Sequence, residues 1–161
     1  MVAYRRAVVT GSFRLGLRVA DVKAAGDFYR GLGFDEVGRV PDADGRPVFV
    51  ILERGEARLL VDALQGMPFP DTEREQRIQR GPRGLGAAIG LHVDDLEAVY
   101  AYCLSNGCEI TCEPMKEAWG DRIFECLDPF GYLWEFFNPS QDQELAAGLA
   151  ATRDAWFGER A

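Results

Sequence analysis

The feature of this sequence that most constrains its fold is an internal repeat with a constant spacing of 74 residues. Similar residue types recur at this spacing through one helix-like segment and the strand-like segments around it. The aligned pairs, each differing by 74, are Leu17 with Leu91, Val19 with Val93, Asp21 with Asp95, Gly33 with Gly107, Phe49 with Ile123 and Leu59 with Leu133. Because a duplicated unit generally cannot bury its apolar face alone, we expect two copies of one module that close around a shared cleft.

The first copy predicts the element order β-α-β-β-β. Residues 15–20 alternate in the manner of a strand, and Asp21 then precedes an apolar stripe with helical spacing. Three strand-like segments follow, separated by turn-forming residues. The stripe consists of Val22, Ala25, Phe28, Tyr29 and Leu32, and the three segments are residues 36–40, 48–53 and 57–64.

The second copy predicts the same order. Residues 88–93 form a predicted strand, Asp94 or Asp95 caps a predicted helix, and three more strands follow. The last two strands, residues 123–127 and 132–137, are joined as a hairpin by turn-forming residues. The pattern therefore indicates an α+β protein built from two β-α-β-β-β modules.

The predicted organisation is one domain followed by an extension. The predicted domain spans residues 1–138, and the extension spans residues 139–161. Within the domain, module one covers residues 13–64, the loop 65–86 and module two 87–138. The loop is rich in proline, glycine and charge, which is typical of a linker or mobile loop, with one short helical turn near residues 74–79.

The extension predicts an amphipathic helix over residues 141–157. Its apolar or small residues recur every three to four positions beside polar ones. These residues are Leu145, Leu149, Thr152 and Trp156. Two roles stay open for this helix, namely a lid over its own sheet or a brace between two copies in a dimer.

Composition restricts the classes of partner. The 161 residues are 47% hydrophobic and 27% charged, which is ordinary for a folded protein with a substantial core. A formal net charge of −8 has the wrong sign for a nucleic-acid binder. No segment approaches the roughly 20 apolar residues of a membrane helix, and residues 1–13 lack the apolar core of a signal peptide. We therefore expect a cytoplasmic protein that binds neither nucleic acid nor membrane.

Glu135 is the most informative polar residue, because it lies within a strand of aromatic residues. Alternation along residues 132–137 places Glu135 on one face with Leu133 and Phe137. A carboxylate between two apolar side chains needs a chemical reason. Glu125, on the preceding strand, is an alternative acid–base partner whose separation from Glu135 the sequence leaves open.

Further motifs accompany the repeat. The first predicted helix carries Phe28-Tyr29 seven residues after its aspartate, and Gly31-Leu32-Gly33-Phe34 follows. A closing motif reads Asp128-Pro129-x-Gly131-Tyr132-x-x-Glu135. Together with the repeat, these motifs resemble the vicinal oxygen chelate superfamily of glyoxalase I, extradiol dioxygenases and bleomycin-resistance proteins. The resemblance covers about residues 13–138. It implies two modules that form a curved mixed sheet around a cleft, commonly in a homodimer.

In metal-dependent members of that superfamily, each module supplies one metal ligand from its first strand and one from its last. The resemblance assigns these positions to Arg14, Ala88 and Glu135, and subtracting 74 from 135 gives Val61 as the fourth. Asp62 would take that position only after a one-residue slip, which turns a side chain to the opposite face. A divalent ion needs several converging oxygen or nitrogen ligands. We therefore expect no metal cofactor and, in its place, an ion pair between Arg14 and Glu135.

Other residues are weaker candidates. His92 is the single histidine and shares a predicted strand face with Ala88, so it is either a ligand-contacting or catalytic group or a structural histidine. Arg18 occupies the aligned position in module one, and Trp119 precedes Gly120 in a predicted loop where it can contact a ligand. The cysteines lack the paired spacing of a zinc site and are expected to be reduced structural thiols. They are Cys103, Cys108, Cys112 and Cys126.

Two functions follow from the resemblance and the residues. The first is a metal-free protein that sequesters an aromatic or cationic small molecule in a dimer cleft, with Arg14, Arg18, His92, Trp119 and Glu135 as ligand contacts. The second is a lyase, isomerase or dioxygenase of the same superfamily, either metal-dependent or using His92 and Glu135 as its catalytic groups. The acidic net charge and the incomplete ligand set favour the first function.

Overall fold

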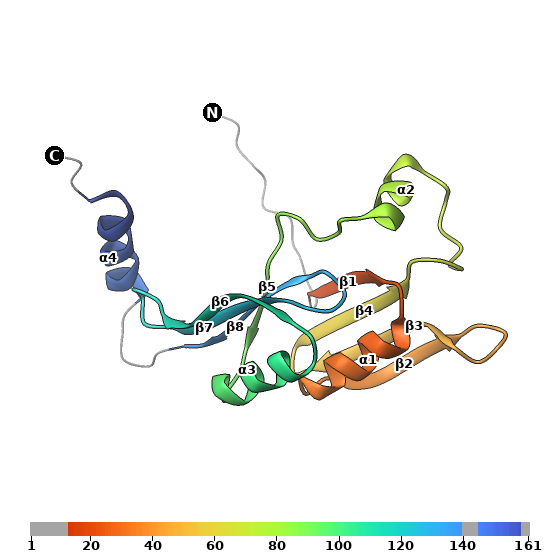
Figure 1. The fold of residues 1–161 in the computed structure, drawn as a ribbon, viewed down its shortest axis with the longest axis horizontal. Helices are drawn as coiled ribbons and strands as arrows, with labels where there is room; N and C mark the ends of the chain where they lie inside the picture. Colours follow the sequence, from red (N-terminus) through yellow and green to blue (C-terminus); the bar gives the residue numbers. More distant parts are fainter. Residues whose placement is uncertain (1–12, 140–144, 159–161) are drawn as a thin grey trace. The chain divides into compact units, whose positions relative to one another are not determined.

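A computed structural model describes residues 13–139 and 145–158 (Figure 1). The chain divides into two compact units after Asp71, within the predicted loop. The sequence predicts no signal peptide in residues 1–13, and residues 1–12 lie outside the described residues. In the described ranges, no helix has the length and apolar character needed to cross a membrane.

The first unit forms the predicted β-α-β-β-β order. Its elements are β1 (Arg14–Val19), α1 (Val22–Gly31), β2 (Asp35–Pro41), β3 (Pro47–Arg54) and β4 (Ala57–Ala63). The four strands make one sheet in the order β1-β4-β3-β2. Strands β1 and β4 are parallel, and the other neighbours are antiparallel. Helix α1 lies along this sheet and packs on β3 and β4 (Figure 1).

Helix α1 begins and ends where the sequence predicts. Asp21 is its N-cap, and the Oδ1 atom of Asp21 accepts a hydrogen bond from the Ala24 amide at 2.9 Å. Beyond the helix, Gly33 has a φ of 88°, a conformation that glycine adopts without steric cost. The predicted apolar stripe is buried throughout, as are the β1 and β4 residues that face it. These residues are Val22, Ala25, Phe28, Tyr29 and Leu32 of the stripe with Leu17, Val19, Leu59 and Val61 of the strands.

The second unit repeats the order and adds a helix at each end. Its elements are α2 (Glu73–Arg80), β5 (Ile89–His92), α3 (Leu96–Ser105), β6 (Glu109–Lys116), β7 (Arg122–Leu127), β8 (Leu133–Asn138) and α4 (Leu145–Phe157). The sheet order is β5-β8-β7-β6, which matches that of the first unit position by position. Asp95, one of the two predicted caps, accepts a hydrogen bond from the Ala98 amide at 2.9 Å. Helix α2 confirms the helical turn predicted within the loop.

A buried aspartate closes the β7–β8 hairpin. Asp128 is only 4% exposed. Its Oδ1 atom accepts hydrogen bonds from the Phe130 and Tyr132 amides at 2.9 and 3.0 Å, and its Oδ2 atom accepts one from Trp134 Nε1 at 2.8 Å. A buried carboxylate is tolerated when its oxygens are satisfied in this way. The turn therefore fixes the start of the aromatic strand β8.

Helix α4 contacts the loop between β6 and β7 through a glycine. A Cβ atom placed on Gly148 would lie 2.3 Å from the Cα atom of Trp119, so only glycine permits this approach. Thr152, one turn later, is buried and donates a hydrogen bond to the Gly148 carbonyl at 2.9 Å. Leu149 and Trp156 of the predicted stripe are instead 51% and 67% exposed. The helix thus packs by Gly148 and Thr152, and the side chains of Leu149 and Trp156 face outward.

Candidate functional site

Each sheet has one face packed against the helix of its own module and a second face turned away from it, here called the far face. In the second unit, the buried side chains that face α3 are Phe124, Cys126, Trp134 and Phe136. Because side chains alternate along a strand, the far face carries Glu125, Glu135 and Phe137.

Glu125 and Glu135 lie directly opposite each other on β7 and β8. Both side chains are half-buried. Burial raises the pKa of Glu135, and the nearby carboxylates of Glu125, Glu117 and Asp121 raise this pKa further. The separation that the sequence left open is therefore one cross-strand step, and the pair concentrates negative charge at the centre of the sheet.

His92 lies at the end of β5, opposite Phe137. The two rings are stacked, with centroids 5.6 Å apart and an interplanar angle of 19°. The His92 side chain is 53% exposed, and its Nε2 atom lies 4.0 Å from Asp94 Oδ1. Gly90, one far-face position earlier, lies opposite Glu135 and adds no side chain there. An exposed ring stack thus stands beside the carboxylate pair.

The far face of the first unit carries arginines. Arg14 is exposed and lies opposite Arg58, and Arg18 lies opposite Asp62. The guanidinium of Arg18 donates hydrogen bonds to the Ala63 and Leu64 carbonyls at 3.2 and 3.4 Å.

Arg18 also lies 4.0 Å from the centroid of the Phe69 ring. Burial raises the pKa of Asp62, while Arg18 opposes this shift. Arg18 is thus held by contacts within its own chain, and its contact with a ligand stays a prediction. The ion pair predicted between Arg14 and Glu135 joins residues of different units and stays a prediction.

The assignment of Val61 as the counterpart of Glu135 is wrong by one residue. Gly16 lies opposite Leu60 in the first sheet, as Gly90 lies opposite Glu135 in the second. The true counterpart is therefore Leu60, at a spacing of 75 (135 − 60). Val61 faces α1 and is fully buried.

The cause of the error is the longer β7–β8 turn. Four residues separate the paired Glu53 and Arg58 of the first hairpin, whereas five separate the paired Leu127 and Leu133 of the second. The extra residue shifts every later position by one, so Asp62 lies on the far face without any strand slip.

The corrected positions do not fit a divalent metal ion. Arg14, Leu60, Ala88 and Glu135 together offer one carboxylate, one cation and two aliphatic side chains. A catalytic metal needs about three protein ligands. Glu125 supplies a second carboxylate beside Glu135, but it lies at none of these four positions.

Trp119 has a structural contact in addition to its predicted role. It lies in the loop between β6 and β7, and its Nε1 atom donates a hydrogen bond to Asp121 Oδ2 at 3.1 Å. Its main chain and Cβ atom contact Gly148 of α4. A contact between Trp119 and a ligand stays a prediction.

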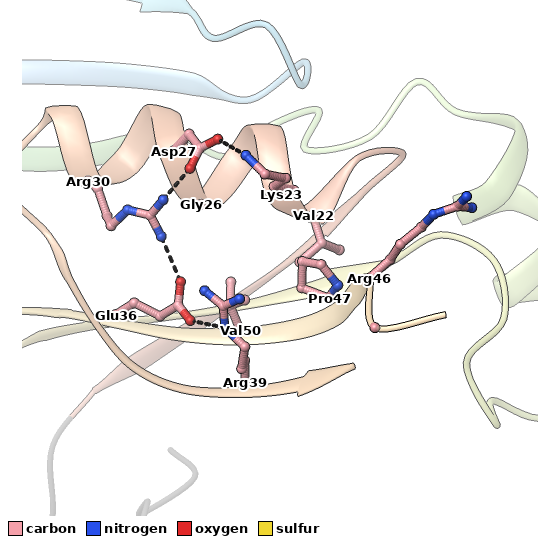
Figure 2. Close-up of a pocket in the computed structure, with 11 residues that line it drawn as sticks. Val22, Lys23, Gly26, Asp27, Arg30, Glu36, Arg39, Arg46, Pro47 and Val50 are labelled. Atoms are coloured by element: carbon pink, nitrogen blue, oxygen red, sulfur yellow. Dashed lines mark hydrogen bonds and ion pairs between the residues drawn. The ribbon is translucent and has the colours of Figure 1, made fainter. Parts of the chain in front are cut away.

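The first unit also contains a cavity of about 230 Å³ between α1 and the strands β2 and β3 (Figure 2). A ladder of ion pairs runs along it. Lys23 donates to Asp27 at 2.7 Å, Arg30 bridges Asp27 and Glu36, and Arg39 donates to Glu36.

The ladder satisfies the carboxylates within the protein itself. The hydrogen bond from Lys23 lowers the pKa of Asp27, and that from Arg39 lowers the pKa of Glu36. Sequence reasoning missed this network, although the spacing of Lys23 and Asp27 is that of a helical ion pair. The charged side chains that line the cavity are therefore best explained as a structural ion-pair network.

Comparisons with known proteins place this architecture in a family. Residues 11–136 match the model of the Glyoxalase/Bleomycin resistance protein/Dioxygenase superfamily, so the chain belongs to this superfamily. An uncharacterized protein of Mycobacterium bovis is 28% identical over 143 residues, which cover 86% of this chain and 91% of that protein.

Two solved structures show the same fold. The bleomycin resistance determinant encoded on the transposon Tn5 is 26% identical, with a TM-score of 0.55, over 81% of this chain and 99% of the other. TioX from Micromonospora sp. ML1 is 22% identical, with a TM-score of 0.61, over 81% of this chain and 100% of the other. These likenesses agree with the family that the sequence motifs indicated.

Proposed function

We propose that this chain is a metal-free small-molecule-binding protein that sequesters a cationic ligand with a planar aromatic part. The observation that supports this function is the pairing of Glu125 with Glu135 on the far face of the second sheet. Like charges directly opposite each other destabilise a sheet by roughly 0.2–1 kcal/mol. A ligand cation placed between the two carboxylates removes this repulsion and forms charge-assisted contacts.

The neighbouring ring stack defines the second part of the ligand. Phe137 follows Glu135 by two residues on β8, so their side chains lie about 7 Å apart on the same face. His92 stacks on Phe137 and keeps half of its surface exposed. A ligand that contacts both features therefore carries its cationic group and its ring about 7 Å apart. Similarity to the bleomycin resistance determinant supports bleomycin as the first compound to test.

Two copies of the chain form the proposed functional unit. Helix α4 exposes Leu149, Trp156 and Phe157, which are 51%, 67% and 70% exposed. Large apolar side chains gathered on one helix are typical of an interface. Light scattering of the purified protein is expected to give the mass of a homodimer, and a monomer at every concentration would contradict this part of the proposal.

Calorimetric titration with bleomycin, phenethylammonium and the neutral 2-phenylethanol tests the ligand class. We expect the cations to bind and the neutral alcohol to bind at least tenfold more weakly, because a charge-assisted hydrogen bond contributes about 1.5–3 kcal/mol. Glu135→Gln is expected to abolish this preference. The exposed Glu109 of β6 provides the control variant Glu109→Gln, which should bind like the wild type. Equal binding of the charged and neutral compounds would overturn the proposal.

The second candidate function is an enzyme of the same superfamily. The adjacent carboxylates of Glu125 and Glu135 favour it, because hard divalent ions prefer carboxylate oxygens, and the raised pKa of Glu135 suits a general acid or base. Titration with Mn²⁺ and Ni²⁺ separates the two functions. Stoichiometric binding that is lost in Glu135→Gln would replace our first proposal by the second.

A further inference from the structure

Three of the four cysteines meet on the helix side of the second sheet, away from the carboxylate pair. Cys103 belongs to α3, Cys108 follows that helix, and Cys126 belongs to β7. Their Sγ atoms all lie within 4.8 Å of one another. Cys103 and Cys126 are 0% and 1% exposed, and Cys108 is half-buried. The cluster is therefore closed toward the core and reaches solvent through Cys108.

The backbone brings these thiols together. Helix α3 ends at Ser105, and Gly107, with a φ of 81°, turns the chain back toward the sheet. The Cys103 carbonyl then accepts a hydrogen bond from the Cys108 amide at 3.1 Å, which fixes Cys108 beside the last turn of the helix. Since α3 packs on β7, Cys126 completes the group.

Three converging sulfurs form a ligand set for a soft metal ion. Thiolate sulfurs bind such an ion at about 2.3 Å, which places three sulfurs around it roughly 4 Å apart. The observed limit of 4.8 Å requires a contraction of less than about 1 Å.

The charge of the surroundings favours a divalent ion. Asp128 follows Cys126 by two residues, and the whole chain carries a net charge of −8. Three thiolates in this setting are better compensated by two positive charges than by one. Asp128 itself is committed to the hairpin turn. Within the described ranges, no other histidine, cysteine or acidic side chain joins the group.

We propose that Cys103, Cys108 and Cys126 bind one thiophilic divalent ion of the zinc and cadmium type through three thiolates. Its fourth position lies on the partly exposed Cys108 side and takes an external ligand. This site is independent of the proposed ligand face, because Cys126 and Glu125 are adjacent on β7 and point to opposite faces of the sheet.

Titration of the reduced, chelator-treated full chain with Cd²⁺ tests the site. We expect one ion per chain, with an absorption band from sulfur-to-cadmium charge transfer. Cys108→Ser should weaken Cd²⁺ binding at least tenfold while the protein melts as the wild type does, since Cys108 is the least buried of the three. Cys112→Ser is the matched control, because Cys112 lies opposite Glu125 and outside the cluster. Equal weakening in both variants, or less than one ion bound, would overturn the proposal.

Alkylation provides a measurement that requires no variant. Iodoacetamide labelling of the folded wild-type chain, followed by peptide mass spectrometry, reports the access of each thiol. Added Zn²⁺ is expected to slow labelling of Cys108 at least tenfold and to leave labelling of Cys112 unchanged. Labelling of Cys108 at the same rate with and without Zn²⁺ would contradict the site even if the titration detected an ion.

Discussion

Glu125 and Glu135 face each other across β7 and β8. Among the described residues of the second unit, none of the ion pairs includes either carboxylate. Two half-buried carboxylates in this arrangement lower the stability of the sheet, and strand pairing does not require them. Such costs are typically retained at binding and catalytic sites. The stability of a Glu135 variant therefore tests whether the two carboxylates repel each other.

Glu135→Gln is expected to stabilise the ligand-free protein at neutral pH by roughly 0.2–1 kcal/mol, because it removes the repulsion. The folded-state pKa of Glu135 is raised above 4.5, so the folded protein binds this proton more tightly than the unfolded chain. Stability therefore falls as pH rises from 4.5 through the raised pKa, and the gain from the variant should be absent at pH 4. Urea denaturation at pH 7.5 and pH 4 measures this. A loss of stability at pH 7.5 would instead support the ion pair of Glu135 with Arg14.

Glu36→Gln is expected to destabilise the protein by about 0.5–1 kcal/mol at pH 7, because Glu36 accepts from both Arg30 and Arg39 (Figure 2). The folded-state pKa of Glu36 is lowered below 4.5. Its contribution is thus fully present above 4.5 and is lost as pH falls through the lowered pKa. Urea denaturation in low salt and in 1 M NaCl should show a smaller effect at high salt. The exposed Glu56 provides the control variant Glu56→Gln, and an equal loss there would refute the role of the ladder.

Trp134→Phe is expected to lower the free energy of unfolding by about 1–3 kcal/mol, because it leaves the buried Asp128 without its indole donor. Guanidinium denaturation followed by far-UV circular dichroism measures the loss. Phe13→Leu, at a side chain that is 81% exposed, should change stability by less than about 0.5 kcal/mol. Similar effects of the two variants would show that the Asp128 hydrogen bond contributes nothing.

Gly148→Ala is expected to release α4 from the β6–β7 loop, since the added methyl carbon would overlap the Trp119 backbone. The rate of limited proteolysis within residues 145–158 should rise, and the combined tryptophan emission should shift toward that of a hydrated indole. Ala150→Ser, at an exposed position of the same helix, is the control. Unchanged proteolysis in Gly148→Ala would mean that α4 does not dock through this contact.

The sequence predicted both modules well, because the helix caps and apolar stripes are local features. Asp21 and Asp95 cap α1 and α3, and the stripe of α1 is buried as expected. Val61 was misassigned because a constant spacing of 74 does not account for the extra residue of the β7–β8 turn. The meeting of Cys103, Cys108 and Cys126 depends on the packing of α3 on β7, which no motif spacing reports.

The candidate site was predicted only where it depends on a single strand. Alternation placed Glu135 and Phe137 on one face, but the pairing of Glu135 with Glu125 needed the register of two strands. The inward packing of Gly148 on Trp119 was missed, because a hydrophobic pattern gives more weight to Leu149 and Trp156 than to a glycine.

The matching registers of the two sheets show which positions are alike in both modules and which positions differ. On the helix side, Val61 and Phe136 occupy equivalent positions and are both buried and apolar. On the far side, Leu60 is equivalent to Glu135, and the two differ completely in charge. The far face of each module can therefore carry different side chains while both cores keep the same packing. A chain of this kind can change what it recognises by substitutions on a single face, at a small cost in stability and without a new scaffold.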